Sequence, residues 1–191
     1  MNSNEFVKKY LDEAHTIFDV YRGAEFEKAM DIMWKCYLDN KQVFIFGNGG
    51  SAGTSSHMVN DLSKGSSVEG KKRLRVIGLA DNMSLLTAYA NDCGYETVFE
   101  EQLKNLVNEG DICIAISASG NSPNVIRAVE YARKVKAYVI SLVGFTGGKL
   151  KPLSDVALYF NTHNYGICED AQLMFSHMSS QYLHQKIKAL E

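Results

Sequence analysis

The stretch DICIAISASGNSPNVIRAVEYARKV, residues 111–135, decides the fold class. After Asp111 it opens with an almost wholly apolar run, which predicts a strand that is covered on both faces. A polar loop follows, and Ser122 with Pro123 forms a favourable N-cap and first-turn pair for the helix that comes next. A buried strand that leads through a short loop into a helix indicates a parallel sheet with helices on both sides.

The same alternation extends outward along the chain. Further strands are expected in four apolar runs, at 42–46, 73–80, 137–145 and 156–161. Apolar residues at helical spacing predict helices within 4–40, with a break at Gly23. Helices are also expected at 52–63, 84–92, 96–108 and about the last 20 residues. We therefore predict one domain, 1–191, of the α/β class, with a doubly wound parallel five-stranded sheet flanked by helices. Residues 1–40 would form an N-terminal helical hairpin that packs against copies of itself in an oligomer.

The composition narrows the classes of partner. Hydrophobic residues make up 46% of the 191 residues, the formal net charge is -2 and the pI is about 6.2. This chain lacks the basic excess that marks binding to nucleic acid or to an anionic membrane. No apolar stretch reaches the roughly 20 residues that span a bilayer, and the charged N-terminus has no signal-peptide pattern. The four cysteines form no CxxC pair, so we expect free thiols in the reducing cytoplasm rather than disulfides.

Two strand-to-helix loops carry residues that suit an anion. GNGGS, at 47–51, has glycines that let the backbone come close to a ligand, and the helix after it offers free N–H groups. SASGNS, at 117–122, adds three hydroxyls. Either loop alone also fits an ordinary turn, but two of them at the carboxyl ends of strands favour a phosphate site. GNGGSAG lacks the GxGxxG spacing and no GxxxxGK[ST] occurs, so no nucleotide cofactor is expected.

GNGGS followed by a helix, together with ISASGNSPNVIRAVEYAR, resembles the sugar isomerase (SIS) family, and in particular its phosphoheptose isomerases. The similarity extends to the N-terminal helices, to TAYANDCGYETVFEEQL and to the VGFTGGKL turn. The resemblance implies a homo-oligomer, most simply a tetramer, and a site for a small phosphorylated sugar. In that site the phosphate would be held by Ser51, Ser117, Ser119 and Ser122. The sugar would be lined by Asn48, Gly49, Asn91 and Asp92, and Gly50 is a further expected substrate-binding residue.

The first pair of candidate catalytic residues follows the GNGGS loop. His57 and Asp61 are four residues apart, so they share one face of the expected helix. The family that this chain resembles has His and Glu at these positions, which makes Asp61 shorter by one methylene group.

The second pair depends on how the C-terminal helix is aligned. The phosphoheptose isomerases carry a Gln and a His there, with seven residues between them. An ungapped alignment places Leu173 and Gln181 at those positions, whereas a shift of four residues pairs Glu169 with His177. We adopt the shift because it restores an ionisable pair and requires only a shorter surface loop.

These residues also suggest a metal. Two imidazoles and two carboxylates, from His57, Asp61, Glu169 and His177, suit zinc or another divalent cation. Some members of the resembling family bind zinc through the matching residues. The alternative is that His177 is a solvated or core histidine and Glu169 only an acid near a helix N-terminus.

The expected activity is isomerisation of a phosphorylated ketose, with sedoheptulose 7-phosphate as the favoured substrate. A proton would move between C2 and C1 through an enediol, which needs a base and a partner acid. Asp61 or Glu169 would shuttle the proton and His177 would be the partner acid/base. Two alternatives stay open: a non-catalytic SIS protein that binds the bacterial replication initiator or another protein, and an isomerase of a different phosphosugar.

Overall fold

The computed structural model describes residues 2–190, and its centre is one sheet of five parallel strands. The strands are β1 (Gln42–Gly47), β2 (Arg75–Gly78), β3 (Ile112–Ser117), β4 (Tyr138–Val143) and β5 (Val156–Tyr159). Their order across the sheet is β2-β1-β3-β4-β5. Every residue of β3, the strand in the stretch quoted first, is buried. The predicted fold class, a parallel five-stranded α/β sheet, is confirmed.

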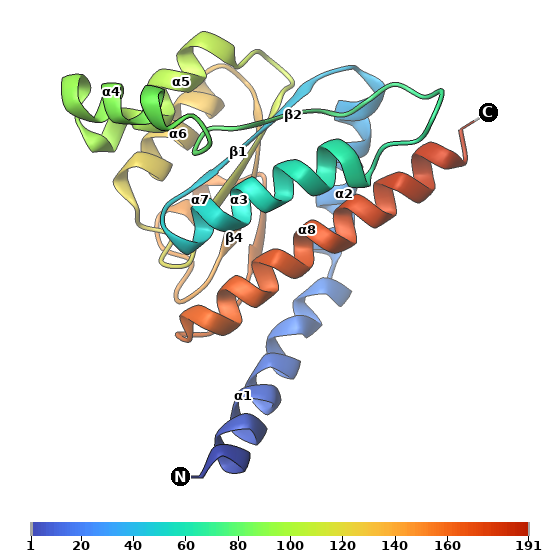
Figure 1. Cartoon of the computed structure of the whole chain (residues 1–191), viewed down its shortest axis with the longest axis vertical. Coiled ribbons are helices and arrows are strands. Elements are labelled where there is room, and N and C mark those ends of the chain that lie inside the picture. Colours follow the sequence, from blue (N-terminus) through green and yellow to red (C-terminus); the bar gives the residue numbers. More distant parts are fainter. Residues whose placement is uncertain (1, 191) are drawn as a thin grey trace.

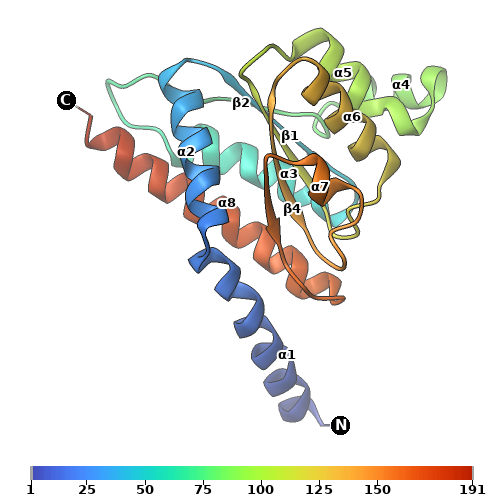
Figure 2. The ribbon, with the colours of Figure 1, turned by 180° about the vertical axis from the view of Figure 1, so that it is seen from behind.

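Helices cover both faces of the sheet (Figures 1 and 2). One core is built with α1 (Ser3–Phe18), α2 (Ala24–Leu38), α3 (Gly50–Asn60) and α8 (Tyr165–Lys188). The other is built with α4 (Met83–Cys93), α5 (Val98–Leu106), α6 (Pro123–Lys134) and the short α7 (Leu150–Leu153). Across residues 2–190, we find no helix with the length and apolar character that a bilayer crossing needs.

The two N-terminal helices are present, but they follow one another instead of folding back as a hairpin. A single 3₁₀ turn, Asp19–Arg22, joins α1 to α2, and α1 extends away from the rest of the molecule (Figures 1 and 2). Tyr10 on α1 donates a hydrogen bond to Asp170 on α8, at 2.7 Å. The outer part of α1 leaves the side chains of Phe6, Val7 and Leu11 about half exposed.

The strand order creates a crevice beside the centre of the sheet. From β1 the chain moves outward to β2 on one side, whereas from β3 it moves to β4 and β5 on the other. The loops after β1 and β3 therefore diverge, and such a switch point is where open α/β sheets bind ligands. These are the GNGGS and SASGNS loops, at 47–51 and 117–122.

Helices α3 and α8 lie side by side and begin at the same end of the sheet (Figure 1). Both helices run away from the crevice in the same direction. Residues further along α3 and α8 therefore lie next to one another, deeper along the helices than the two loops. The chain after α3 widens into one π-helical turn, Asp61–Gly65.

Candidate active site

A cavity of about 300 Å³ lies between the two loops at the switch point. Asn48, Gly49, Gly50 and Ser51 line it from the first loop, and Ser117, Ser119 and Ser122 from the second. Ile116, Ala118, Tyr165 and Glu169 complete the lining. No Lys or Arg is among these residues, so an anion here would be held by hydroxyls and backbone N–H groups. The loop residues that the sequence predicted for substrate binding thus share one cavity.

The backbone of the first loop is shaped for close approach. Gly49, the residue before α3, has φ +55° and ψ -122°, a conformation that side chains strongly disfavour. A Cβ on Gly50 would stand 2.1 Å from Oε1 of Glu169, so the absence of a side chain lets that carboxylate reach the loop. Gly50 and Ser51, the first two residues of α3, line the cavity, and N–H groups at the start of a helix have no partner within it.

The second loop is held by its own hydroxyls and by a neighbouring turn. Ser117 Oγ accepts a hydrogen bond from the Gly120 N–H at 3.2 Å and lies 3.3 Å from Ser122 Oγ. Ser122 is the residue before α6, as predicted, but its side chain makes no capping bond and remains directed to the loop. The VGFTGGKL turn supports the loop from outside, since the N–H of Leu150 donates to the Gly120 carbonyl at 3.0 Å.

Asn48 is fixed by a small amide network. Its side chain exchanges two hydrogen bonds with the buried Asn124, at 2.8 and 2.9 Å. The Tyr95 hydroxyl also donates to Asn48 Oδ1, at 2.9 Å. The network joins the first loop to α6 and to the segment after α4, and it fixes the orientation of the Asn48 amide.

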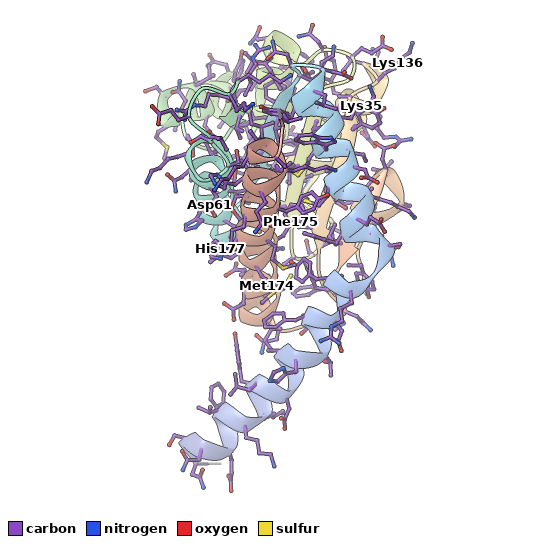
Figure 3. All side chains as sticks on the ribbon, turned by 90° about the vertical axis from the view of Figure 1, so that its right-hand side faces the viewer. Lys35, Asp61, Lys136, Met174, Phe175 and His177 are labelled. Atoms are coloured by element: carbon purple, nitrogen blue, oxygen red, sulfur yellow. The ribbon has the colours of Figure 1, made fainter. Side chains whose placement is uncertain are left out.

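Further along α3 and α8, three side chains converge on one point. The Nε2 atoms of His57 and His177 lie 3.2 Å apart, and Asp61 Oδ2 is 3.3 Å from the first and 3.7 Å from the second. Figure 3 shows Asp61 and His177 next to each other, on the two adjacent helices. Two imidazole nitrogens at this distance need a shared proton or a cation between them.

The size of this triangle fits a metal. Zinc ligands at 2.0–2.1 Å in a tetrahedron stand about 3.3–3.4 Å from one another, close to the three separations observed. All three donor atoms belong to residue types that bind zinc, and both imidazoles are nearly half exposed. Three protein ligands with access from solvent would leave a position open for substrate or water.

Three other predicted site residues lie apart from this cluster. Glu169 does not join the group of three and instead borders the cavity between the two loops. Asn91 and Asp92 are exposed on α4, where the Asn91 amide donates to Asp92 Oδ1 at 2.7 Å, and they are not in the cavity lining.

The structure also brings in residues that the sequence reading missed. Tyr165 lines the cavity, Asn124 and Tyr95 hold Asn48, and Ser176 donates a hydrogen bond to Asp61 Oδ2 at 2.8 Å. Tyr95 lies within the TAYANDCGYETVFEEQL segment that carries the family resemblance, so it could have been considered from the sequence. The others become visible only once the helices are packed.

One of the four cysteines, Cys168, packs beneath this cavity. All four are free. Cys168, beneath the cavity on α8, is buried, and burial raises the pKa of its thiol to about 12. A Cβ on Gly144 would stand 2.5 Å from Cys168 Sγ, so the sulfur packs tightly under the second loop.

Comparison with known proteins agrees with this geometry. Residues 9–144 match the family model described as "SIS domain". The chain is 33% identical to a phosphoheptose isomerase of Aliarcobacter butzleri over 95% of its length and 96% of the relative's. It is 40% identical to a phosphoheptose isomerase of Helicobacter pylori over 93% of each chain. The structure of a phosphoheptose isomerase from Francisella tularensis superposes with a TM-score of 0.88 at 26% identity, covering 97% of this chain and all of that one. The chain belongs to the SIS domain family.

Proposed function

We propose that this protein is an aldose–ketose isomerase of a phosphorylated sugar, with sedoheptulose 7-phosphate as the favoured substrate. The observation that carries the proposal is the joint presence of a hydroxyl-lined anion cavity and a His–Asp–His cluster along the same two helices. The relatives of nearly equal length named phosphoheptose isomerase support it independently.

The spacing along α3 suits a long sugar phosphate. Seven residues at 1.5 Å each separate Gly50, at the cavity, from His57 by about 10 Å along the helix axis. A phosphate bound at the helix N-terminus would therefore have the far end of an extended seven-carbon chain near the cluster. The hydroxyls of Ser51, Ser117, Ser119 and Ser122 would hold the phosphate, and Asn48 with Gly49 would contact the sugar.

The ionisable side chains of the site would carry out the proton transfer. Moving a proton between C1 and C2 through an enediol needs a base beside those carbons and an acid beside the oxygens. Of the two predicted bases, Asp61 lies in the cluster, near the expected position of C1 and C2, whereas Glu169 borders the cavity between the loops. His177 is the partner acid/base. A divalent metal such as zinc, held by His57, Asp61 and His177, would polarise the carbonyl and hydroxyl oxygens. Glu169 as a fourth ligand, and Asn91 with Asp92 as sugar contacts, stay predictions.

We further propose that the chain works as one SIS unit within a homotetramer, with residues 1–40 in the subunit interface. The half-exposed Phe6, Val7 and Leu11 on the extended α1 support this, because isolated apolar helix faces are normally covered. The free thiols support a reducing, cytoplasmic compartment.

The alternative of a non-catalytic SIS protein that binds a replication initiator or another protein has no need for converging imidazoles. The experiment that separates these functions is a panel of ketose phosphates with five, six and seven carbons, followed by detection of the aldose phosphate. Product from the seven-carbon substrate alone supports the proposal, and product from a shorter one redirects it to another phosphosugar. No product from any of them, in the presence of zinc, contradicts an isomerase.

The same assay distinguishes the two candidate bases. Asp61→Asn and Glu169→Gln each remove a charge while keeping the shape of the side chain. A variant that loses about 10²–10⁴-fold in kcat while it keeps the wild-type affinity for Zn²⁺ identifies the base. Wild-type kcat in both variants would remove both carboxylates from the chemistry.

A further inference from the structure

Ser176 stands out among the serines of α8 by the direction of its hydrogen bond. It precedes His177, is fully buried, and its hydroxyl donates across to Asp61 Oδ2 at 2.8 Å. Buried serines in helices usually bond to a carbonyl of their own helix. Ser179 does this, since its hydroxyl donates to the Ser176 carbonyl at 3.0 Å. The Ser176 hydroxyl therefore links α8 to the turn after α3, whereas the Ser179 hydroxyl bonds within α8.

The oxygen that accepts this bond is the one that faces both imidazoles. Asp61 Oδ2 lies 3.3 Å from His57 Nε2 and 3.7 Å from His177 Nε2. Terminal torsions of Asp are broad, so a carboxylate without partners would sample many orientations. Within residues 2–190, the other oxygen, Oδ1, has only a long contact of 3.5 Å with the Asn60 amide. The Ser176 hydroxyl is thus the short hydrogen bond that fixes the Asp61 carboxylate.

The position of Asp61 in the chain makes this support necessary. Asp61 follows the last residue of α3 and is the first residue of the π-helical turn, where the regular helix ends. Its side chain is short, so small shifts of that turn move Oδ2 directly. Since Ser176 and His177 are neighbours, one placement of α8 sets both the imidazole and the carboxylate.

We propose that Ser176 is a positioning residue that holds Asp61 Oδ2 in the orientation required by the His57–Asp61–His177 cluster. The proposal rests on the proposed function for its catalytic consequence, but its effect on metal binding stands apart from turnover. Hydrogen-bond partners of metal-binding carboxylates and imidazoles typically change metal affinity or activity by about 10–100-fold when they are removed.

The test compares Ser176→Ala with Ser179→Ala. The two changes remove the same hydroxyl from fully buried positions on the same helix, but only the first reaches Asp61. Affinity for Zn²⁺ would be measured by competition with a chromophoric chelator, and the Co²⁺ form would be compared by its visible spectrum. Circular dichroism would verify that each variant is folded, and kcat and KM would be measured separately.

We expect Ser176→Ala to bind Zn²⁺ about 10–100-fold more weakly, with an altered Co²⁺ spectrum and a lower kcat at unchanged KM. Ser179→Ala should match the wild type, and Ser176→Thr, which keeps the hydroxyl, should recover metal affinity. Wild-type Zn²⁺ affinity and spectrum in Ser176→Ala, equal losses in both alanine variants, or no Zn²⁺ binding by the wild type would overturn the proposal. If the wild type turns over no ketose phosphate, the proposed function fails, and the metal measurements still decide the role of Ser176.

Discussion

Gly120, in the SASGNS loop, offers the sharpest test that the proposed phosphate cavity is preorganised by backbone packing. It has φ +64°, and a Cβ built on it would stand 2.2 Å from the Gly147 carbonyl oxygen and 3.1 Å from the Gly148 nitrogen. Both neighbours are backbone atoms of the VGFTGGKL turn. Neither can move aside as a flexible side chain would, so Gly120→Ala must displace one loop from the other.

The size of the effect can be worked out from these contacts. The left-handed conformation alone costs a non-glycine residue roughly 1–2 kcal/mol. Because ordinary contact begins at 3.4 Å, relief of the clash with Gly147 separates the loops by about 1.2 Å. A misplacement of about 1 Å can cost about 10²-fold in catalysis. We expect a melting temperature lower by about 2–8 °C and a KM for the phosphorylated substrate raised at least about tenfold.

Gly53→Ala is the matched control for this change. Gly53 is exposed on α3, and a Cβ there would meet nothing within 4 Å. Alanine at that position should leave KM unchanged and stabilise the protein slightly, because alanine favours helix more than glycine does. Thermal unfolding and steady-state kinetics on both variants complete the test. A Gly120→Ala protein with wild-type melting temperature and KM would refute the argument from loop packing.

Three further predictions follow from other parts of the molecule. A thiol reagent at pH 8 should titrate only Cys93 in the native protein and all four cysteines in denaturant, since burial raises the pKa of Cys36 and Cys168 to about 12 and that of Cys113 strongly; rapid reaction of a second native thiol would contradict the burial. Leu11→Glu, which places a charge on the exposed apolar face of α1, should lower the mass seen by light scattering relative to wild type, and an unchanged mass would remove α1 from the interface. Dialysis against a chelator should abolish turnover and added Zn²⁺ should restore it, whereas full activity in the chelated protein would argue against a metal at the His–Asp–His cluster.

Much of the fold was predictable because short sequence patterns determine its strands and loops. The apolar runs specify strands that are buried on both faces, and glycines and serines at their ends specify loops. The cavity also followed, since loops after neighbouring parallel strands meet at one edge. The hairpin did not follow, because the turn at Gly23 does not determine the angle at which two helices leave it.

The C-terminal helix shows where reasoning from the sequence ran out. The shifted alignment selected His177 because it can ionise, and in the structure His177 lies beside His57 and Asp61. The same reasoning grouped Glu169 with them from its angle around the helix. However, the eight-residue step from Glu169 to His177 also spans about 12 Å along the helix axis. The Glu169 carboxylate therefore lies at the cavity between the two loops. Ser176 escaped notice because its role depends on the approach of α3 to α8.

The most direct test of the central claim is a proton NMR measurement on sedoheptulose 7-phosphate in D₂O with the zinc-loaded protein. The account predicts signals of an aldose 7-phosphate with deuterium at C2, produced by the wild type and by Gln181→Ala. It predicts that His177→Ala forms the aldose, and incorporates deuterium at C2, at least about 10²-fold more slowly than the wild type. Absence of aldose and of deuterium exchange with the wild type, or unchanged rates in His177→Ala, would contradict it.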